Sequence, residues 1–210
     1  MADSLTAASP LSGWSEKFST LAPALHVQEE PFVTMFDLWA DPQGPTAAWT
    51  SDILGLQLPT TPGTSVSNGT YTLIWLGPEE WLITSDKRPP ALLEAALRPV
   101  VVEHGGALVD VSAQRTTIHL DGPSARDVLA KGCSMDLHPN VFADGTAVQT
   151  TLALTDVILV ADSGGTGFRI LVRAAFAPYL ADWLIDAGEE YGVDPLNLIS
   201  SSHTAEPAIR

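Results

Sequence analysis

The sequence contains very little cysteine. Cys133 is the single cysteine among 210 residues, so no disulfide can form within the chain. Small secreted domains commonly depend on disulfides, whereas cytoplasmic proteins keep their thiols reduced. We therefore expect a cytoplasmic protein whose fold is held together by a hydrophobic core.

Basic residues are also scarce. The chain has 10 Lys and Arg against 25 Asp and Glu, which gives a formal net charge of −15. Proteins that bind nucleic acids gain much of their affinity from Lys and Arg contacts to phosphates. A surface this acidic repels polyanions and anionic membranes. The sequence therefore predicts neither a nucleic-acid partner nor a membrane partner.

Long apolar runs are missing. The longest are short stretches such as residues 157–161, far below the ~20 residues that a membrane-spanning helix needs. Residues 1–10 contain Asp3 and have no basic residue ahead of an apolar stretch, which does not fit a secretory signal. We expect neither a membrane span nor export.

Apolar residues nevertheless make up 45% of the chain, enough for a substantial core. Runs of β-branched and aromatic residues predict strands, with turns at Gly77-Pro78 and Gly164-Gly165. Periodic apolar segments predict helices, two of them opened by a Gly-Pro pair. The predicted strands are 31–39, 71–76, 81–85, 108–111, 116–120, 151–161 and 167–173, and the predicted helices are 45–54, 89–103, 123–132 and 176–191.

The two ends of the chain differ from its middle. Residues 1–28 are rich in Ser, Ala, Thr and Pro with scattered apolar anchors, which predicts an N-terminal arm packed on the core or on a partner. Residues 197–210 have no apolar period after Ile199, which predicts a flexible tail. Between them we expect two α+β repeats, at 29–110 and 111–196.

The two repeats are predicted from self-similarity within the chain. An offset of 87 residues (192 − 105) aligns a strand, a helix and a helix-ending glycine in both halves. The helix positions step i, i+1, i+4, i+5, i+8, as in a helix that lies on a sheet. The aligned residues are Trp81, Ile83, Ser85, Leu92, Leu93, Ala96, Leu97, Val100 and Gly105, and in the second half Phe168, Ile170, Val172, Tyr179, Leu180, Trp183, Leu184, Ala187 and Gly192.

A second alignment, at an offset of 78 residues (122 − 44), pairs the Gly-Pro helix starts at 44–47 and 122–125. Each half then reads as strand, helix, strand, strand, helix. The expected fold class is α+β with duplicated ferredoxin-like units. Chance matches between strand–hairpin–helix segments are the alternative, and the matching glycines and five-position stripe favour duplication.

The sequence shows no recognisable catalytic arrangement. Cys133 follows Gly132 at the far end of its helix, away from the N-terminus that would stabilise a thiolate, which indicates a structural thiol. The histidines lack the spacing of metal ligands, and no serine lies in a Gly-x-Ser-x-Gly elbow. Adjacent acids such as Glu29-Glu30 are interpreted as solvated charge. The sequence therefore predicts no catalytic, cofactor-binding or metal-binding residue.

Two features go beyond what a plain core requires. Trp75 and Trp81 flank a predicted turn, and aromatic residues near turns are common anchors of protein interfaces. The alternative is that these tryptophans close the core of the chain. Arg115 lies between two predicted strands, where its cation could pair with a partner's acid. Trp75, Trp81 and Arg115 are the candidate partner-interface residues.

Four segments resemble a known family. They are 75–82 (WLGPEEWL), 109–117 (VDVSAQRTT), 130–139 (AKGCSMDLHP) and 176–184 (FAPYLADWL). In this order they resemble the gamma subunit of heterotetrameric sarcosine oxidase, and the resemblance runs from about Trp14 to Tyr191.

The resemblance implies a non-catalytic subunit that supports assembly of an enzyme complex. That complex oxidatively demethylates sarcosine to glycine and transfers the one-carbon unit to tetrahydrofolate. The resemblance also implies alpha, beta and delta subunits as partners. FAD, FMN, NAD and tetrahydrofolate would be held by those partners, with no cofactor in this chain.

The gamma family is similar to the folate-binding domain of aminomethyltransferases, whose fold contains ferredoxin-like units. This similarity supplies an alternative, a folate-binding aminomethyltransferase-like protein that acts on its own. Two observations disfavour this alternative. In related iron–sulfur assembly factors, Lys-Gly-Cys is followed by an aromatic residue and Gly-Gln-Glu, whereas here Lys131-Gly132-Cys133 is followed by SMDL. In addition, 210 residues are too few to include the C-terminal β-barrel of a full aminomethyltransferase. A structural domain of some other oxidase is a third alternative.

Overall fold

Two five-stranded antiparallel sheets form the centre of the molecule. The computed structural model describes residues 7–162 and 166–192. The first sheet has the order β3 (Ser65–Ser67), β4 (Thr72–Gly77), β5 (Glu80–Ser85), β2 (Thr34–Trp39), β6 (Ala107–Asp110). The second has the order β1 (His26–Glu30), β7 (Arg115–Asp121), β10 (Phe168–Arg173), β9 (Thr155–Ala161), β8 (Ala147–Leu152). The mixed α+β class predicted from the sequence is confirmed.

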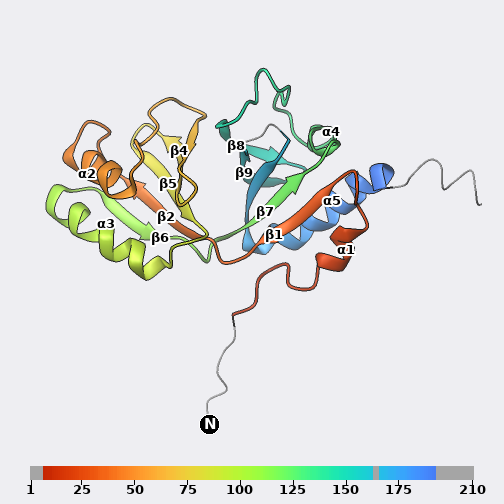
Figure 1. Ribbon diagram of the computed structural model, residues 1–210, viewed down its shortest axis with the longest axis horizontal. Coiled ribbons are helices and arrows are strands. Elements are labelled where there is room, and N and C mark those ends of the chain that lie inside the picture. The colour runs from red at the N-terminus through yellow and green to blue at the C-terminus, as the bar shows by residue number, and fades with distance from the viewer. Residues whose placement is uncertain (1–6, 163–165, 193–210) are drawn as a thin grey trace, which may run out of the picture.

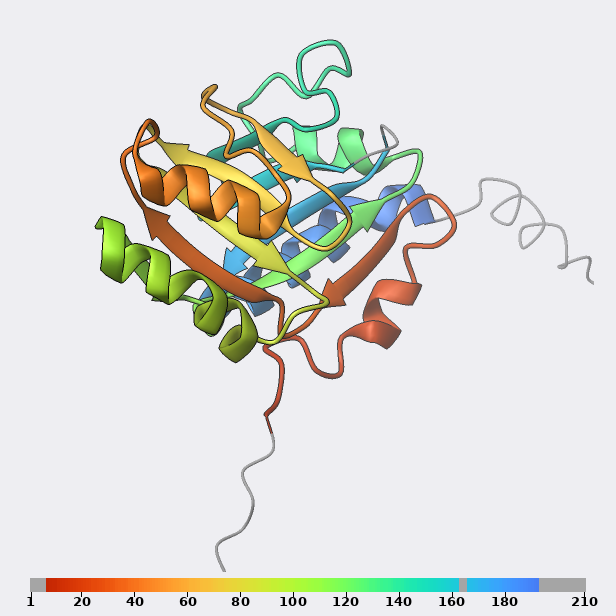
Figure 2. The same cartoon turned by 60° about the vertical axis from the view of Figure 1, so that its left-hand side comes forward.

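Each sheet carries helices on one face. The first sheet is covered by α2 (Pro45–Leu54) and α3 (Pro90–His104), which pack against each other. The second is covered by α4 (Ala125–Ala130) and α5 (Ala177–Gly192), with a 3-10 turn, η1 (Ala174–Phe176), leading into α5, while the short α1 (Ser15–Ser19) contacts β1. The remaining faces of the two sheets meet, so the layers run helix, sheet, sheet, helix (Figure 1 and Figure 2).

Alternation of side chains along the strands divides the apolar residues among three cores. In β2, Phe36 and Leu38 join the core under α2 and α3, whereas Met35 joins the core between the sheets. The core between the sheets draws residues from both, for example Leu82 of β5 and Leu171 of β10. Each sheet is therefore apolar on both faces over its central residues, and the two halves of the chain are packed together.

Several predicted boundaries agree with the structure. α2 begins at Pro45 directly after Gly44, as the Gly-Pro pair predicted, and Gly55 ends it with a φ of +66°.

The strand predicted over 151–161 is instead a hairpin, because the chain turns at Ala153, a non-glycine residue with φ +55°. Residues before that turn form β8, and a separate strand there was not predicted from the sequence.

The buried stripe of α3 is narrower than predicted. Leu93, Leu97 and Val101 are buried, whereas Leu92 is 59% exposed. A straight helix on a flat sheet buries positions i, i+4 and i+8, and the neighbouring position turns toward solvent. The prediction of the buried stripe is therefore right at Leu93 and Leu97 and wrong at Leu92.

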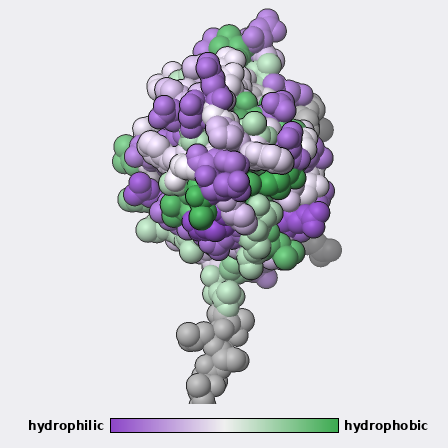
Figure 3. All heavy atoms as spheres, turned by 90° about the vertical axis from the view of Figure 1, so that its left-hand side faces the viewer, coloured by the Kyte–Doolittle hydropathy of each residue, from purple (hydrophilic) through white to green (hydrophobic). Residues whose placement is uncertain are grey.

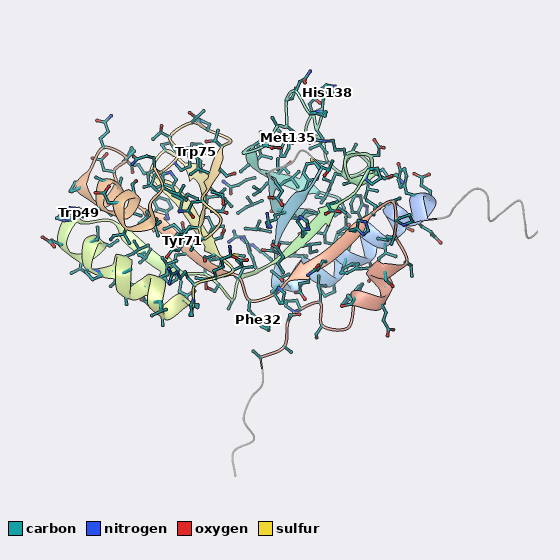
Figure 4. All side chains as sticks on the ribbon, in the orientation of Figure 1. Phe32, Trp49, Tyr71, Trp75, Met135 and His138 are labelled. Atoms are coloured by element: carbon teal, nitrogen blue, oxygen red, sulfur yellow. The ribbon has the colours of Figure 1, made fainter. Side chains whose placement is uncertain are left out.

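The N-terminal segment packs on the second sheet. We expected an arm over 1–28 and a first repeat from residue 29, but residues 26–30 form one strand, β1, which pairs with β7. The side chains of Leu11, Phe18, Leu21 and Leu25 are buried in the core beneath α5. The chain then crosses to the first sheet through a turn at Phe32, which has φ +58° and is exposed (Figure 4).

Two sequence expectations fall on residues outside the described part of the chain. These are the Gly164-Gly165 turn and the tail at 197–210. Among the described residues, no helix is long and apolar enough to cross a membrane.

Candidate functional site

A cavity of about 610 Å³ lies between the two sheets. The first sheet contributes mainly hydroxyl side chains to its wall, and the second contributes apolar residues and an ionic cluster. Chief among the lining residues are Ser65, Ser67, Thr72, Thr84, Ser85 and Lys87 on one side, and Glu30, Thr117, Val160, Asp162, Arg169 and Leu171 on the other. The cavity is thus polar and carries charges of both signs.

Arg169 is the centre of the ionic cluster in that wall. Its Nε and Nη2 donate to Glu30 at 2.9 and 3.0 Å, and its Nη1 lies 2.7 Å from Asp162 Oδ1. The Nε2 of His119 is 3.3 Å from the other oxygen of Asp162. Burial disfavours the charged form of Arg169, but Glu30 and Asp162 outweigh it and raise the pKa of the guanidinium. The cluster therefore connects β1, β7, β10 and the residue that follows β9 through side-chain contacts.

The interpretation of Glu29 and Glu30 as solvated charge was wrong. Glu30 pairs with Arg169, 139 residues further along the chain. Glu29 accepts a hydrogen bond from Thr116 Oγ1 at 2.7 Å and another from the Ser9 hydroxyl. No local sequence signal could have revealed these partners, because they become neighbours only when β1 joins the second sheet.

A second group of interacting charges consists of Asp37 on β2, Glu80 on β5, Arg115 at the start of β7 and Arg173 at the end of β10. Burial raises the pKa of Asp37, against the opposing effects of hydrogen bonding with Trp39 and of the Arg115 charge. Burial and the charge of Asp37 likewise raise the pKa of Glu80. Among the described residues, Asp37 Oδ1 is buried without a hydrogen-bond partner. An ionised Asp37 is therefore an unfavourable group in the folded protein.

Replacement of Asp37 by asparagine is expected to stabilise the protein at neutral pH. Because the folded-state pKa of Asp37 is raised, the ionised carboxylate disfavours folding above that pKa, and the penalty disappears as the pH falls toward 3.8, the ordinary pKa of an aspartate. The gain should be present at pH 7, where the carboxylate is ionised, and vanish in acid. Urea unfolding of wild type and Asp37→Asn between pH 4 and pH 8 measures it. Glu79→Gln, on the exposed turn before β5, is the control and should leave the free energy of unfolding unchanged. A gain in stability for Asp37→Asn that does not depend on pH would contradict this explanation.

The structure separates the three candidate interface residues. Trp81 is completely buried, and its Nε1 donates to the carbonyl of Pro59 at 2.7 Å, so it is a core residue and is not available to a partner. This corrects the interface prediction for Trp81. Trp75 lies opposite Trp81 on β4 and is half-buried (Figure 4). Its position leaves part of the indole accessible.

Arg115 faces acids of its own chain. Burial and the nearby Arg173 lower the pKa of Arg115, while Asp37 and Glu80 act in the opposite direction. Arg115 is thus partly exposed and interacts with Asp37 and Glu80 of its own chain, which only partly offset the effects of burial and Arg173. The structure does not bring Trp75, Trp81 and Arg115 together as one surface.

The reactive residue types are dispersed. Cys133 is buried against the helix-side core of the second sheet, as expected for a structural thiol. Within residues 7–162 and 166–192, no group of three or more His, Cys, Asp or Glu side chains has the geometry to hold a metal ion. The cavity wall holds Arg169 in ion pairs with Glu30 and Asp162, and these paired charges do not form a nucleophile activated by a base.

Comparison with known proteins gives consistent results. Residues 39–190 match the model of the "Sarcosine oxidase, gamma subunit family". The sarcosine oxidase subunit gamma of Corynebacterium sp. (strain U-96) is 36% identical over 169 residues, which cover 80% of this chain and 81% of that protein.

Solved structures show the same similarity. A chain of the heterotetrameric sarcosine oxidase from Corynebacterium sp. U-96, in complex with pyrrole 2-carboxylate, superposes with a TM-score of 0.83 at 31% identity, covering 90% of this chain and 97% of that one. The glycine cleavage system aminomethyltransferase T from Bartonella henselae superposes with a TM-score of 0.57 at 16% identity, over 84% of this chain and 49% of that one, and shares the fold. On the extent of these matches, this chain belongs to the sarcosine oxidase gamma subunit family.

Proposed function

We propose that this chain is the non-catalytic gamma subunit of a heterotetrameric sarcosine oxidase. In this proposal it supports assembly of the complex that oxidatively demethylates sarcosine to glycine, with transfer of the one-carbon unit to tetrahydrofolate. The observation that carries the proposal is the superposition on nearly a whole chain of a heterotetrameric sarcosine oxidase. The ion pairs of Arg169 with Glu30 and Asp162 support a structural role for the inter-sheet region.

The proposal assigns the chemistry to other chains. Alpha, beta and delta subunits are the partners, and FAD, FMN, NAD and tetrahydrofolate belong to them, with no cofactor in this chain. The high acid content fits this division, since cationic surfaces on the partners would complement a chain of net charge −15. The cytoplasm is the proposed location of the complex.

Expression of the chain with and without the other three subunits tests the proposal. We expect co-expression to yield one complex that contains the chain in fixed stoichiometry and consumes oxygen when sarcosine is added. The chain purified alone should show neither flavin absorbance nor sarcosine-dependent oxygen uptake. Activity of the isolated chain, or a fully stable and active complex assembled without it, would contradict the proposal.

The cavity between the sheets bears on the folate-binding alternative. Its wall carries the acids Glu30, Asp86 and Asp162 against the bases Lys87 and Arg169. Arg169 is already bound to two of these acids. A folate brings two further carboxylates, so electrostatics disfavour it here. Calorimetric titration of tetrahydrofolate into the purified chain should give no saturable heat, and a saturable signal would favour the alternative.

The finer fold assignment is that the chain contains two ferredoxin-like units produced by duplication. Counted from one edge, the sheets run β6-β2-β5-β4-β3 and β1-β7-β10-β9-β8. Helices follow the equivalent strands β2 and β7, and again β5 and β10. The first four strands of each list have the order fourth, first, third, second of a ferredoxin-like unit. In the second unit, β1 from the N-terminus takes the place of the fourth strand.

A further inference from the structure

Helices α3 and α5 occupy equivalent places on the two sheets, which allows their outer faces to be compared position by position. Leu93 and Leu97 of α3 face the first sheet, and Leu180 and Leu184 of α5, each 87 residues later (180 − 93), face the second. All four side chains are at most 2% exposed. Residues of α3 and α5 that are 87 positions apart therefore have equivalent orientations relative to their sheets, and this holds for the outer faces of the two helices as well.

The outer face of α5 is strongly acidic. Asp182, Asp186, Glu189 and Glu190 are all exposed on it. This composition is expected of a solvated helix in a chain of net charge −15. Salt bridges to Lys17 and Lys131 involve two of these acids.

The outer face of α3 is apolar at three of the four positions equivalent to these acids, and the fourth is Glu103. The positions equivalent to Asp182, Asp186 and Glu189 are Ala95, Pro99 and Val102, all of them exposed, and Val102 is 77% exposed. Leu92 at the start of α3 is 59% exposed. The charges of Glu94 and Arg98 are paired with each other along the helix, and Glu103 is the exposed acid that remains.

Helix α2 extends this apolar surface. It packs against α3 on the same side of the first sheet, and its Trp49 and Ile53 are 52% and 40% exposed. Figure 4 shows Trp49 on the outer side of these helices, and in Figure 3, which views this side, hydrophobic residues reach the surface among hydrophilic ones. The α2–α3 face is defined here as Trp49, Ile53, Leu92, Ala95, Pro99 and Val102.

Exposed apolar residues scattered singly need no explanation, but a group of them on two adjoining helices does. The four largest side chains of the α2–α3 face expose on the order of 400 Å², about half of what one partner contributes to an interface of standard size. That amount suits the apolar centre of an interface surrounded by a polar rim.

We infer that the α2–α3 face docks on an apolar, uncharged surface of another subunit of the oxidase complex. The inference rests on the proposed function. Charge argues against a second copy as the occupant, because two chains of net charge −15 repel each other and the α2–α3 face offers no basic residue free to offset this. A different subunit avoids that repulsion, and the similar chain of Corynebacterium sp. U-96 belongs to a heterotetramer.

Introducing the residue that α5 carries at the equivalent position tests the inference. Val102→Glu reproduces Glu189 on α3, and because Val102 is exposed the fold should tolerate it. Leu154→Glu is the matched control, since Leu154 is an 85% exposed apolar residue on the β8–β9 turn of the other unit and acquires the same charge. Leu92→Asp is a second variant on the docking face, placed in the first turn of α3, where an acid favours the helix.

Each variant is co-expressed with the remaining subunits, and its affinity for them is measured with the purified components. Val102→Glu and Leu92→Asp are expected to raise the Kd at least tenfold, whereas Leu154→Glu should leave it within twofold of wild type. Thermal unfolding of each purified variant shows whether it is still folded. If one of the two docking-face variants is unfolded, the Kd of the other variant tests the inference.

The outcomes distinguish this inference from the proposed function. If the wild-type complex forms and neither docking-face variant weakens it, or if Leu154→Glu weakens it equally, the inference is overturned and the proposed function stands. If the wild-type chain joins no complex, the proposed function fails and the inference fails with it. If the wild-type chain self-associates and Val102→Glu makes it monomeric without affecting the complex, a second copy is the occupant and the inference is overturned.

Discussion

Replacing Trp81 with alanine is expected to destabilise the chain by about 3–5 kcal/mol, a large part of the roughly 5–15 kcal/mol that stabilises a typical domain. The indole is fully buried between β5 and the helices α2 and α3, so its loss leaves a large apolar cavity. It also removes the hydrogen bond that holds the carbonyl of Pro59. Urea unfolding followed by circular dichroism measures the change, and thermal unfolding should show a decrease in Tm of roughly 10 °C or more.

Trp75→Ala is the matched control for Trp81→Ala. The two indoles lie opposite each other on β4 and β5, but Trp75 is half-buried and makes no comparable interior contact. Its removal should cost no more than about half as much. Equal losses for the two variants would contradict the placement of Trp81 as the core residue of the pair. Reduced affinity of Trp75→Ala for the other subunits, with stability retained, would support the expectation that Trp75 contacts a partner.

Replacing Gly106 with alanine is expected to cost about 3 kcal/mol or more. Gly106 has a φ of +109°, and a Cβ there would lie 2.3 Å from the carbonyl oxygen of Trp39. That oxygen belongs to the backbone at the end of β2, so it cannot move without disturbing the pairing of β2 with β6. Backbone strain and steric overlap act together at this position. Loss of soluble protein, or a much lower urea midpoint, is the expected result.

Gly69→Ala separates the two contributions at Gly106. Gly69 also has a positive φ, +77°, but nothing lies within 4 Å of a Cβ added there. Its replacement should therefore cost only the conformational strain, about 1 kcal/mol. If both variants lost the same stability, the close approach of Gly106 to Trp39 would not be the cause.

Much of the fold follows from local patterns in the sequence. The Gly-Pro pair that starts α2 and the apolar periods of α3 and α5 are features of neighbouring residues, and neighbouring residues determine helix boundaries. The strand β8 was missed because its residues Val148, Gln149 and Thr150 alternate without a continuous apolar run. Its turn at Ala153 also lacks the glycine or asparagine that normally indicates a tight hairpin.

The site was harder to predict than the fold, because its contacts join distant segments. Arg169 and Glu30 become neighbours only because β1 and β10 both pair with β7. No sequence pattern near either residue predicts this ion pair. For Trp75 and Trp81 the sequence could show only that both lie near a turn. The alternation of faces places both on the helix side of the sheet, but the loop that contains Pro59 decides which one is covered.

The place of β1 in the second sheet has a consequence for the order of events on the ribosome. The strands of the first sheet lie between residues 34 and 110, so that sheet can assemble as soon as they emerge. β1 is synthesised earlier, but its partner β7 follows about 90 residues later, a wait of roughly 5–20 s at ordinary rates of translation. During that time β1 is an unpaired strand, and unpaired strands aggregate when they are apolar. Its sequence, His-Val-Gln-Glu-Glu, is mostly polar and charged. The polar composition of β1, which gives no strand signal in the sequence, therefore also disfavours aggregation of the nascent segment until β7 has been made.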